Sequence, residues 1–425
     1  MTSSMKKRIT QIRHGQVPKG YMKNVFGVVP DAWHKSRIDE ICRLSSGSTP
    51  RRDNAGNFNG NILWVTSGEL KAKFVHDTKE KVSQLATKES RLELYEPGTV
   101  VVAIYGLEAA GIRGTASIIE KRCTISQACM AFSDFKDVDN EFFYYWYLHN
   151  GSFIGTRFAQ GTKQQNLSSE IIGSLLINLP SLAEQRKIAK ILAAQDKVIE
   201  LKEKRLAEKQ RQKKYLMQQL LTGKKRLKGF NGEWEGKCLC DVCFFATKCT
   251  TGELCDYVST ENMVADLRNN VCFEDSQKGR QGIEFLKGDI LIANIRPYLK
   301  KVWKATKRGV CSADVLVLRP MGFSSEFLYR LIANDDFFAY VMIAAKGSKM
   351  PRGDKKHIMS MPIMLPISEK ERTAISQFMN TVDKELALLA DDLIQEKQKK
   401  KALMQLLLTG IVRVPIKGNK ERTSQ

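Results

Sequence analysis

The chain has 425 residues, of which 43% are hydrophobic and 27% charged, which is enough to build more than one hydrophobic core. No run approaches the roughly 18 to 20 apolar residues that cross a bilayer, and the basic start from Met1 to Arg8 does not lead into the apolar stretch of a signal peptide. These features argue against a membrane protein or a secreted one, and we expect a cytoplasmic protein with no membrane partner.

The charge balance is strongly basic, with 68 Lys and Arg against 46 Asp and Glu and a formal net charge of +22. Such an excess favours binding to nucleic acid, because cationic side chains that bind phosphates release condensed counterions. A membrane surface would instead require the charge to lie on one amphipathic helix. We therefore expect a nucleic-acid partner, and an ordinary solvated basic surface is the alternative interpretation.

The ten cysteines, in a chain without a secretory signal, favour reduced thiols over a disulfide framework. A zinc site usually repeats a Cys-x2-4-Cys knuckle in two halves, whereas the densest group here has one overlapping Cys-x-Cys-x2-Cys run and no nearby histidine. We predict buried small side chains and no metal site. That group consists of Cys238, Cys240, Cys243, Cys249 and Cys255.

A repeat divides the chain. The run from Lys213 to Gly223, which ends in Leu-Leu-Thr-Gly, returns from Lys400 to Gly410 at an offset of 410 − 223 = 187 residues, and such self-similarity indicates a duplicated architecture. We predict, in chain order, an N-terminal arm over residues 1–30, a first variable domain over 31–178, a helical segment over 179–229, a second variable domain over 230–364, a second helical segment over 365–411 and a tail over 412–425.

Each variable domain has the pattern of an α/β domain. In both, a glycine turn leads into an apolar strand-like run, at residues 98–102 and 288–292. A glycine, a hydroxyl residue and a lysine stand together later in each domain, at residues 161–163 and 347–349. The predicted fold class is α+β, with two α/β domains separated by two long helices in a pseudo-two-fold tandem repeat.

Residues 184–222 contain no glycine or proline and are rich in good helix formers, so they predict a helix roughly 58 Å long. Apolar residues seven positions apart indicate a coiled-coil seam in each helical segment, interrupted by Lys213 and Lys400. Because each half begins with a domain and ends with a helix, we favour antiparallel packing of the two helices, which gives both domains equivalent settings. An ordinary dimerisation coil is the alternative. The predicted seam residues are Leu192, Ile199, Leu206, Leu220, Met379, Leu386, Leu393 and Leu407.

This ordered set of features resembles the specificity subunits of Type I restriction-modification systems. Residues 46–50, 64–70 and 161–168 are similar to the opening and closing segments of one class of target-recognition domain in that family. Residues 257–263, 288–301 and 347–354 are similar to another class. The resemblance covers nearly the whole chain, apart from the arm up to about Pro30 and the tail after Gly410.

The resemblance implies a division of labour. Each target-recognition domain is expected to read one half of a split site in double-stranded DNA, and the coiled helices to set the gap between the halves. Two methyltransferase subunits are expected to dock on the coil, and restriction (translocase) subunits to join that core. The family implies no cofactor in this chain, and S-adenosylmethionine is expected on the methyltransferase subunit.

Base identity is read by hydrogen bonds to base edges, chiefly from Arg, Lys, Asn and Gln, while phosphate contacts position the protein. Loops that carry these residues on a rigid scaffold are therefore the candidate DNA contacts, and a turn cap or a packing aromatic is the alternative for each of them. We nominate Arg113, Lys163, Gln164, Gln165 and Asn166 in the first domain, and Arg296, Tyr298, Lys300, Lys301, Lys349, Arg352, Lys355 and Lys356 in the second.

A catalytic role is the main alternative, and the motifs argue against it. A DNA methyltransferase needs a Gly-rich cofactor loop and an Asn/Asp-Pro-Pro-aromatic element for the flipped base, and neither occurs. The string nearest to a translocase P-loop, residues 221–225, lacks the first glycine and the hydroxyl residue. We therefore expect a subunit without catalytic activity, and a stand-alone DNA-binding or scaffold protein that dimerises through its coil is the second alternative.

Overall fold

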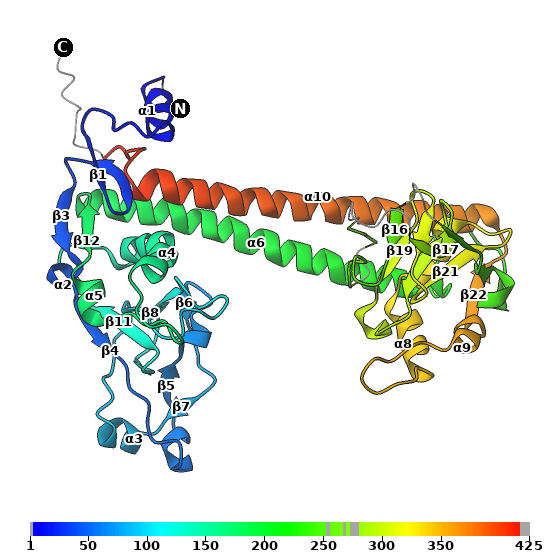
Figure 1. Cartoon of the computed structure of the whole chain (residues 1–425), viewed down its shortest axis with the longest axis horizontal. Helices are drawn as coiled ribbons and strands as arrows, with labels where there is room; N and C mark the ends of the chain where they lie inside the picture. Colours follow the sequence, from blue (N-terminus) through cyan, green and yellow to red (C-terminus); the bar gives the residue numbers. More distant parts are fainter. Residues whose placement is uncertain (1–2, 252–255, 267–268, 273–279, 417–425) are drawn as a thin grey trace. The chain divides into compact units, whose positions relative to one another are not determined.

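The computed structural model describes residues 3–251, 256–266, 269–272 and 280–416 (Figure 1). The chain forms two compact units. Unit 1 contains Met1–Leu201 and the residues from Leu393 onward, and unit 2 contains Lys202–Asp392. No helix in the described ranges combines the length and the apolar character of a membrane span.

Unit 1 is built around a five-stranded sheet in which β8 is the central strand, and it also contains a smaller three-stranded sheet. The five-stranded sheet has the order β4 (Arg43–Ser46), β11 (Cys129–Ser133), β8 (Val100–Ala103), β9 (Ala116–Ile119) and β6 (Phe74–Val75). The three-stranded sheet has the order β10 (Cys123–Ile125), β5 (Ile62–Val65) and β7 (Lys81–Val82). Two antiparallel pairs complete the strands, namely β1 (Tyr21–Asn24) with β2 (Gly27–Pro30) and β3 (His34–Arg37) with β12 (Leu176–Leu179).

The helices of the first variable domain are short except for one, which covers the main sheet. They are α2 (Ile38–Ile41), α3 (Gln84–Glu89), α4 (Asn140–Arg157) and α5 (Ser169–Gly173), with 3-10 turns at Ala55–Phe58 and Ser67–Glu69. The helix α4 begins where Asp139 accepts a hydrogen bond from the backbone N–H of Phe142. All four residues of β8 are buried, as expected for a strand with both faces covered. An additional helix, α1 (Ser3–Arg13), lies in the N-terminal arm.

Unit 2 repeats this plan with different detail. Its sheets have the orders β14 (Cys243–Phe245), β21 (Val315–Pro320), β18 (Ile290–Ala293), β19 (Val302–Lys304) and β15 (Cys249–Thr251), β17 (Gln281–Phe285), β20 (Gly309–Cys311), β16 (Asp256–Val258). The strand β13 (Trp234–Cys238) pairs with β22 (Pro362–Pro366), just as β3 pairs with β12. The helices are α7 (Ser325–Ile332), α8 (Asp335–Ile343) and α9 (Lys355–Met359), with 3-10 turns at Leu239–Asp241 and Pro297–Leu299.

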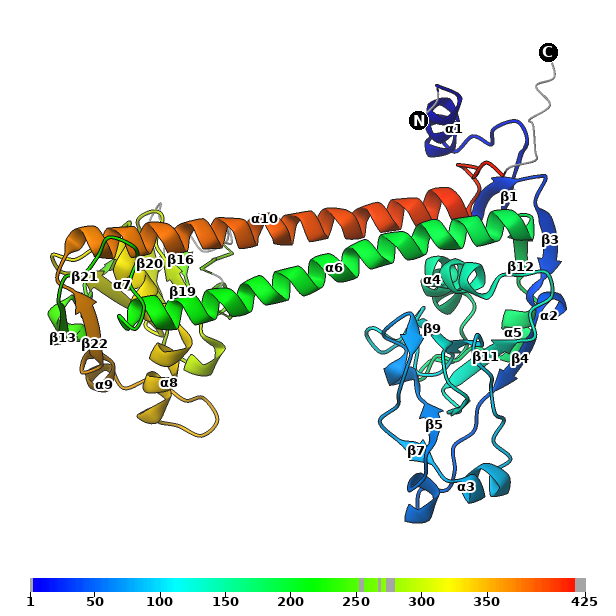
Figure 2. The same ribbon diagram turned by 180° about the vertical axis from the view of Figure 1, so that it is seen from behind.

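The two long helices, α6 (Leu182–Leu221) and α10 (Glu369–Leu408), are each 40 residues long and pack together, as Figures 1 and 2 show. Ion pairs define their direction within each unit. In unit 1, Lys400 lies 2.5 Å from Asp196. In unit 2, Lys202 lies 2.7 Å from Asp392 and Lys213 lies 2.7 Å from Asp383. Residue numbers rise on one helix while they fall on the other, so the helices are antiparallel, and the predicted α+β class with two packed long helices is confirmed.

The predicted seam residues differ in burial along the helices. Those near the helix ends are buried, namely Leu192, Leu220, Met379 and Leu407, and Leu393 is also buried. Ile199, Leu206 and Leu386 are only partly buried. The two lysines at seam positions, Lys213 and Lys400, are accounted for by their aspartate partners on the opposite helix. The coil is therefore held by apolar contacts toward its ends and largely by charge pairs between them.

Each long helix ends at a glycine that no other residue can easily replace. Gly223 and Gly410, 187 residues apart, have φ angles of +71° and +66°. A Cβ added at Gly410 would lie 2.6 Å from Pro30 Cδ, and one at Gly223 would lie 3.0 Å from Trp234 Cδ2. The Leu-Leu-Thr-Gly signature of the repeat thus ends each long helix with a glycine in the left-handed backbone conformation, packed against Pro30 and Trp33 at Gly410 and against Trp234 at Gly223.

Candidate nucleic-acid interface

The nominated residues 163–166 form a hairpin in unit 1. Gln160 and Asn166 exchange backbone hydrogen bonds of 2.9 Å in both directions and so close the hairpin. Gly161 has a φ of +108°, and a Cβ there would lie 2.1 Å from the carbonyl oxygen of Gln164. Lys163 and Gln164 lie at the exposed tip.

A second loop, which follows β8, holds this hairpin. The backbone N–H of Leu107 donates to Gln165 O at 3.1 Å, and the Glu108 carboxylate accepts from Gln165 N at 2.9 Å. That backbone N–H lowers the pKa of Glu108. Arg113 Nη2 donates to Gln165 Oε1 at 2.5 Å, and an added Cβ at Gly155 would lie 2.7 Å from Arg113 Cγ. The structure therefore brings together all five nominated residues of the first domain.

Unit 2 carries the same hairpin. Lys346 N donates to Arg352 O at 3.0 Å, and Arg352 N donates back to Lys346 O at 2.9 Å. Gly347 has a φ of +103°, and Lys349 lies at the exposed tip. The loop after β18 holds the hairpin through the backbone N–H of Arg296, which donates to Pro351 O at 2.8 Å. The two hairpins therefore share their closing bonds, their glycine and their supporting loop.

The other nominated residues of unit 2 divide into two groups. Lys300 Nζ donates to Asp335 at 2.5 Å, Lys301 Nζ donates to Thr260 O at 2.6 Å, and Arg352 pairs with Asp314 at 3.1 Å. These three side chains have protein partners already. Arg296 and Tyr298 are exposed beside the hairpin, and Lys355 and Lys356 are exposed in the first turn of α9. The assignment of all thirteen nominated residues to DNA stays a prediction.

Sequence reasoning missed the residues that position the hairpins. Glu108 in unit 1 and Asp314 in unit 2 hold their hairpins across long sequence separations, which leave no local signal. It also missed Lys346, whose side chain is 82% exposed at the base of the second hairpin. The signal for Lys346 was available, since it stands directly before the repeated Gly-Ser-Lys.

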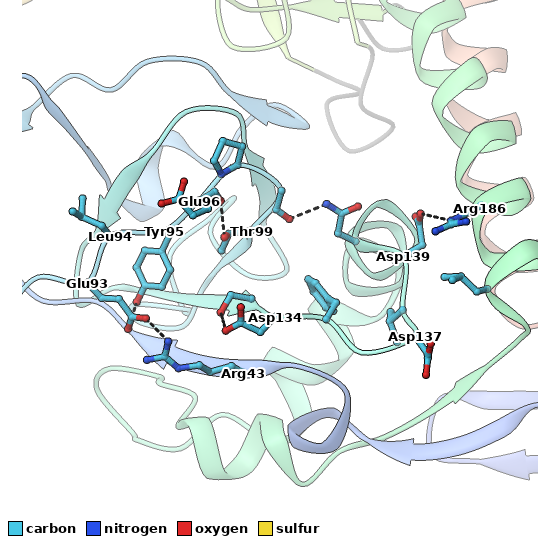
Figure 3. Close-up of a pocket in the computed structure, with 17 residues that line it drawn as sticks. Arg43, Glu93, Leu94, Tyr95, Glu96, Thr99, Asp134, Asp137, Asp139 and Arg186 are labelled. Atoms are coloured by element: carbon cyan, nitrogen blue, oxygen red, sulfur yellow. Dashed lines mark hydrogen bonds and ion pairs between the residues drawn. The ribbon is translucent and has the colours of Figure 1, made fainter.

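An acidic cavity of about 530 Å³ lies elsewhere in unit 1 (Figure 3). Figure 3 shows two of the cation contacts at its wall, Arg43 with Glu93 at 2.7 Å and Arg186 with Asp139 at 3.9 Å. Glu96, Asp134 and Asp137 also line the cavity. These carboxylates would repel DNA phosphates, and none of the residues of the hairpin or of its supporting loop lines this cavity.

The cysteines give one cluster with metal-ligand chemistry among the described residues. Cys238, Cys240 and Asp241 place their ligand atoms within 4.8 Å of one another. This is one ligand short of a closed zinc site, and the Asp241 carboxylate already accepts from the backbone N–H of Cys238 at 2.7 Å. Cys243 is buried, where burial raises the pKa of its thiol to about 12, and Cys249 is exposed. Cys255 lies outside the described residues.

Comparisons with known proteins agree with this architecture. Residues 30–211 match the family model of the Type I restriction modification DNA specificity domain. The Type I restriction enzyme MjaVIII specificity subunit of Methanocaldococcus jannaschii is 22% identical over 92% of this chain and 96% of its own length. The Type I restriction enzyme EcoDI specificity subunit of Escherichia coli is 32% identical over 83 residues, which are 20% of this chain and 18% of that protein.

Two solved structures share the fold. The S subunit of a Type-I restriction-modification system from M. genitalium has a TM-score of 0.53 at 15% identity, with 92% of this chain and 99% of that chain covered. A chain solved to explain complex assembly and conformational transition of the type I R-M system has a TM-score of 0.59 at 16% identity, with 90% and 99% covered.

The fold is that of a two-domain S subunit, in which two long helices pack together beside two α/β domains. The chain is similar to specificity subunits of Type I restriction-modification systems, and residues 30–211 carry the match to the DNA specificity domain of that family.

Proposed function

We propose that each variable domain of this chain reads one half of a bipartite site in double-stranded DNA, in the cytoplasm, through its hairpin and the loop that supports it. The observation that carries this proposal is the occurrence of one hairpin construction in both units with unlike side chains on it. A rigid support with a variable tip is what two readers of different sequences require, because the support sets the register and the tip sets the bases.

The two long helices are proposed to set the unspecified gap between the half-sites. Both helices run without a break for 40 residues. Side-chain pairs across the helices fix their register, including Gln195 with Glu396 and Lys209 with Glu385. A shift by one turn would separate every one of these pairs, so together they favour the observed register.

Two methyltransferase subunits are proposed to dock on these helices. Leu201 on α6 and Leu388 on α10 are 54% and 70% exposed, and they are repeat equivalents because 388 − 201 = 187. Exposed leucines on a helix favour a further helix as a partner. Their repetition favours two copies of the same partner. The methyltransferase would bind S-adenosylmethionine, and the restriction subunits would join this core.

A domain exchange tests the proposal. Residues 31–178 would be replaced by a target-recognition domain of different specificity, and the methylated sequence would be mapped by long-read sequencing in cells that also hold the methyltransferase. We expect one half-site to change while the other half-site and the gap stay the same. A change in both half-sites would contradict separate readers. The purified chain alone should show no methyl transfer and no cleavage.

A scaffold that binds only proteins is the second candidate. It explains the coil, but it gives no reason for two hairpins with exposed lysines at their tips in a chain of net charge +22. An unchanged methylation pattern after the domain exchange would favour it.

A further inference from the structure

The two hairpins agree in their first half and differ in their second. The first half reads Gly161-Thr162-Lys163 in unit 1 and Gly347-Ser348-Lys349 in unit 2. The second half reads Gln164-Gln165 in unit 1 and Met350-Pro351 in unit 2. Both hairpins are closed by the same pair of reciprocal backbone bonds, so Lys163 and Lys349 occupy the same place on the same framework.

The shared lysines have the chemistry of phosphate contacts. Readers of two different half-sites have only the sugar-phosphate backbone in common, so a side chain that both retain should meet what every sequence presents. A lysine ammonium is a compact charge with three donors, and it suits a phosphate oxygen without demanding a particular base. Within the described residues, neither Lys163 nor Lys349 has a carboxylate partner, whereas Lys300 and Arg352 do.

The differing residues have the chemistry of base contacts. The Gln164 side chain is exposed, and a glutamine amide can donate to and accept from adenine in the major groove. Gln165 beside it is held by Arg113 and Glu108, which fixes the hairpin tip. Met350 is exposed at the matching place in unit 2, where an apolar side chain fits the methyl group of thymine.

We propose that Lys163 and Lys349 bind DNA phosphates at equivalent places in the two half-sites, and that Gln164 and Met350 face base edges. This inference rests on the proposed function, and it assigns different tasks to neighbouring residues of the same site. The first half of each hairpin would then bind the DNA backbone, and the second half would recognise bases.

The test uses the chain assembled with its methyltransferase subunits and a duplex that contains the mapped target. Fluorescence anisotropy measures binding over a range of salt concentrations. Lys163→Ala and Lys349→Ala should each lower the slope of log K against log salt by about 0.9, the loss of one phosphate contact, with the methylated sequence unchanged. Lys163→Arg should keep the slope. Lys136→Ala is the matched control and should also keep the slope, because this exposed lysine lies outside the hairpin, in the sequence between Asp134 and Asp137 of the acidic cavity.

The second half of each hairpin is tested in the same assembly. Gln164→Ala should relax base preference in one half-site only, and Met350→Gln should do so in the other, both with the salt slope intact. The inference is overturned if a lysine variant changes the methylated sequence, or if the lysine variants leave the slope unchanged. Melting curves of every variant exclude misfolding. Failure of the domain exchange would defeat the proposed function, whereas a successful exchange with unchanged slopes would defeat this inference alone.

Discussion

Arg413 donates two hydrogen bonds of 2.7 Å to the Glu184 carboxylate, and this pair is repeated by Arg226 and Glu371, with distances of 2.5 and 2.6 Å. The two pairs are separated by 413 − 226 = 187 and 371 − 184 = 187 residues. Both carboxylates are buried, with 2% and 1% of the side chain exposed. The first turn of each long helix is thus locked by an arginine that follows the end of the other helix.

Removal of one arginine should destabilise its unit strongly. Arg413→Ala leaves the buried Glu184 without its cation, and we expect a loss of about 3 kcal/mol in the free energy of unfolding of unit 1. That is the low end of the usual range because the Arg413 side chain is 44% exposed. Urea denaturation measures the loss. Adding Glu184→Gln should recover part of it, and a cost below about 0.5 kcal/mol for Arg413→Ala would refute this role of the pair.

Lengthening the coil should widen the gap in the DNA target. One heptad inserted between Glu203 and Lys204, together with one between Ala390 and Asp391, keeps the antiparallel pairs on both sides in register. Seven helical residues add about 10 Å, or about three base pairs at about 3.4 Å each. Methylome sequencing should show unchanged half-sites with a longer gap. Replacement of a native heptad by another of equal length is the control, and an unaltered gap after insertion would contradict the spacer role.

Charge introduced at the exposed leucines should block assembly one copy at a time. Leu201→Glu and Leu388→Glu should each leave a chain that binds one methyltransferase subunit, and the double variant should bind none, because each site loses an apolar anchor worth about 2 kcal/mol or more. Analytical ultracentrifugation measures the stoichiometry. Leu85→Glu changes a leucine that is 60% exposed on α3, far from the long helices in sequence, and serves as the control. Two copies bound to the double variant would exclude this docking surface.

Unit 2 should lose stability in acid through Asp335. Lys300 donates to this carboxylate at 2.5 Å, and Lys214 lies 3.1 Å away, so the two cations hold the pKa of Asp335 below its ordinary value of 3.8. Because the pKa is lower in the folded state, the stabilisation is complete above about pH 4 and is lost as the pH falls through the folded pKa. Asp335→Asn should therefore destabilise unit 2 more at pH 7 than at pH 3, as urea titrations at the two pH values would show. An equal difference at both pH values would disprove the assignment.

The long helices were predictable because their signal is periodic and local. The predicted helix over 184–222 corresponds to Leu182–Leu221, and the repeat identified its partner. The two lysines at seam positions looked like defects in the sequence, and only the structure shows the aspartates that pair with them.

Contacts between distant segments were not predictable in the same way. Nothing near Arg113 in the sequence indicates that it donates to Gln165, and nothing near Lys300 indicates Asp335. The number of helices was not predictable either. Unit 1 has the single helix α4, whereas unit 2 has α7 and α8 in its place, and Asn334 caps the N-terminus of α8. The sequence predicted which loops carry polar side chains. It did not predict which of those side chains already bind other residues of the protein.

The division into units has a consequence for synthesis on the ribosome. Unit 2 is one continuous stretch, whereas unit 1 includes residues on both sides of it, and its core contains Met404, Leu407 and Val414. At about 5 to 20 residues per second, roughly 10 to 40 seconds pass between the translation of Leu201 and that of Leu393. During that interval Ile188 and Leu192 of the nascent chain lack the side chains that later cover them. The variable domain that is translated first is therefore completed last, after the final helix has been synthesised.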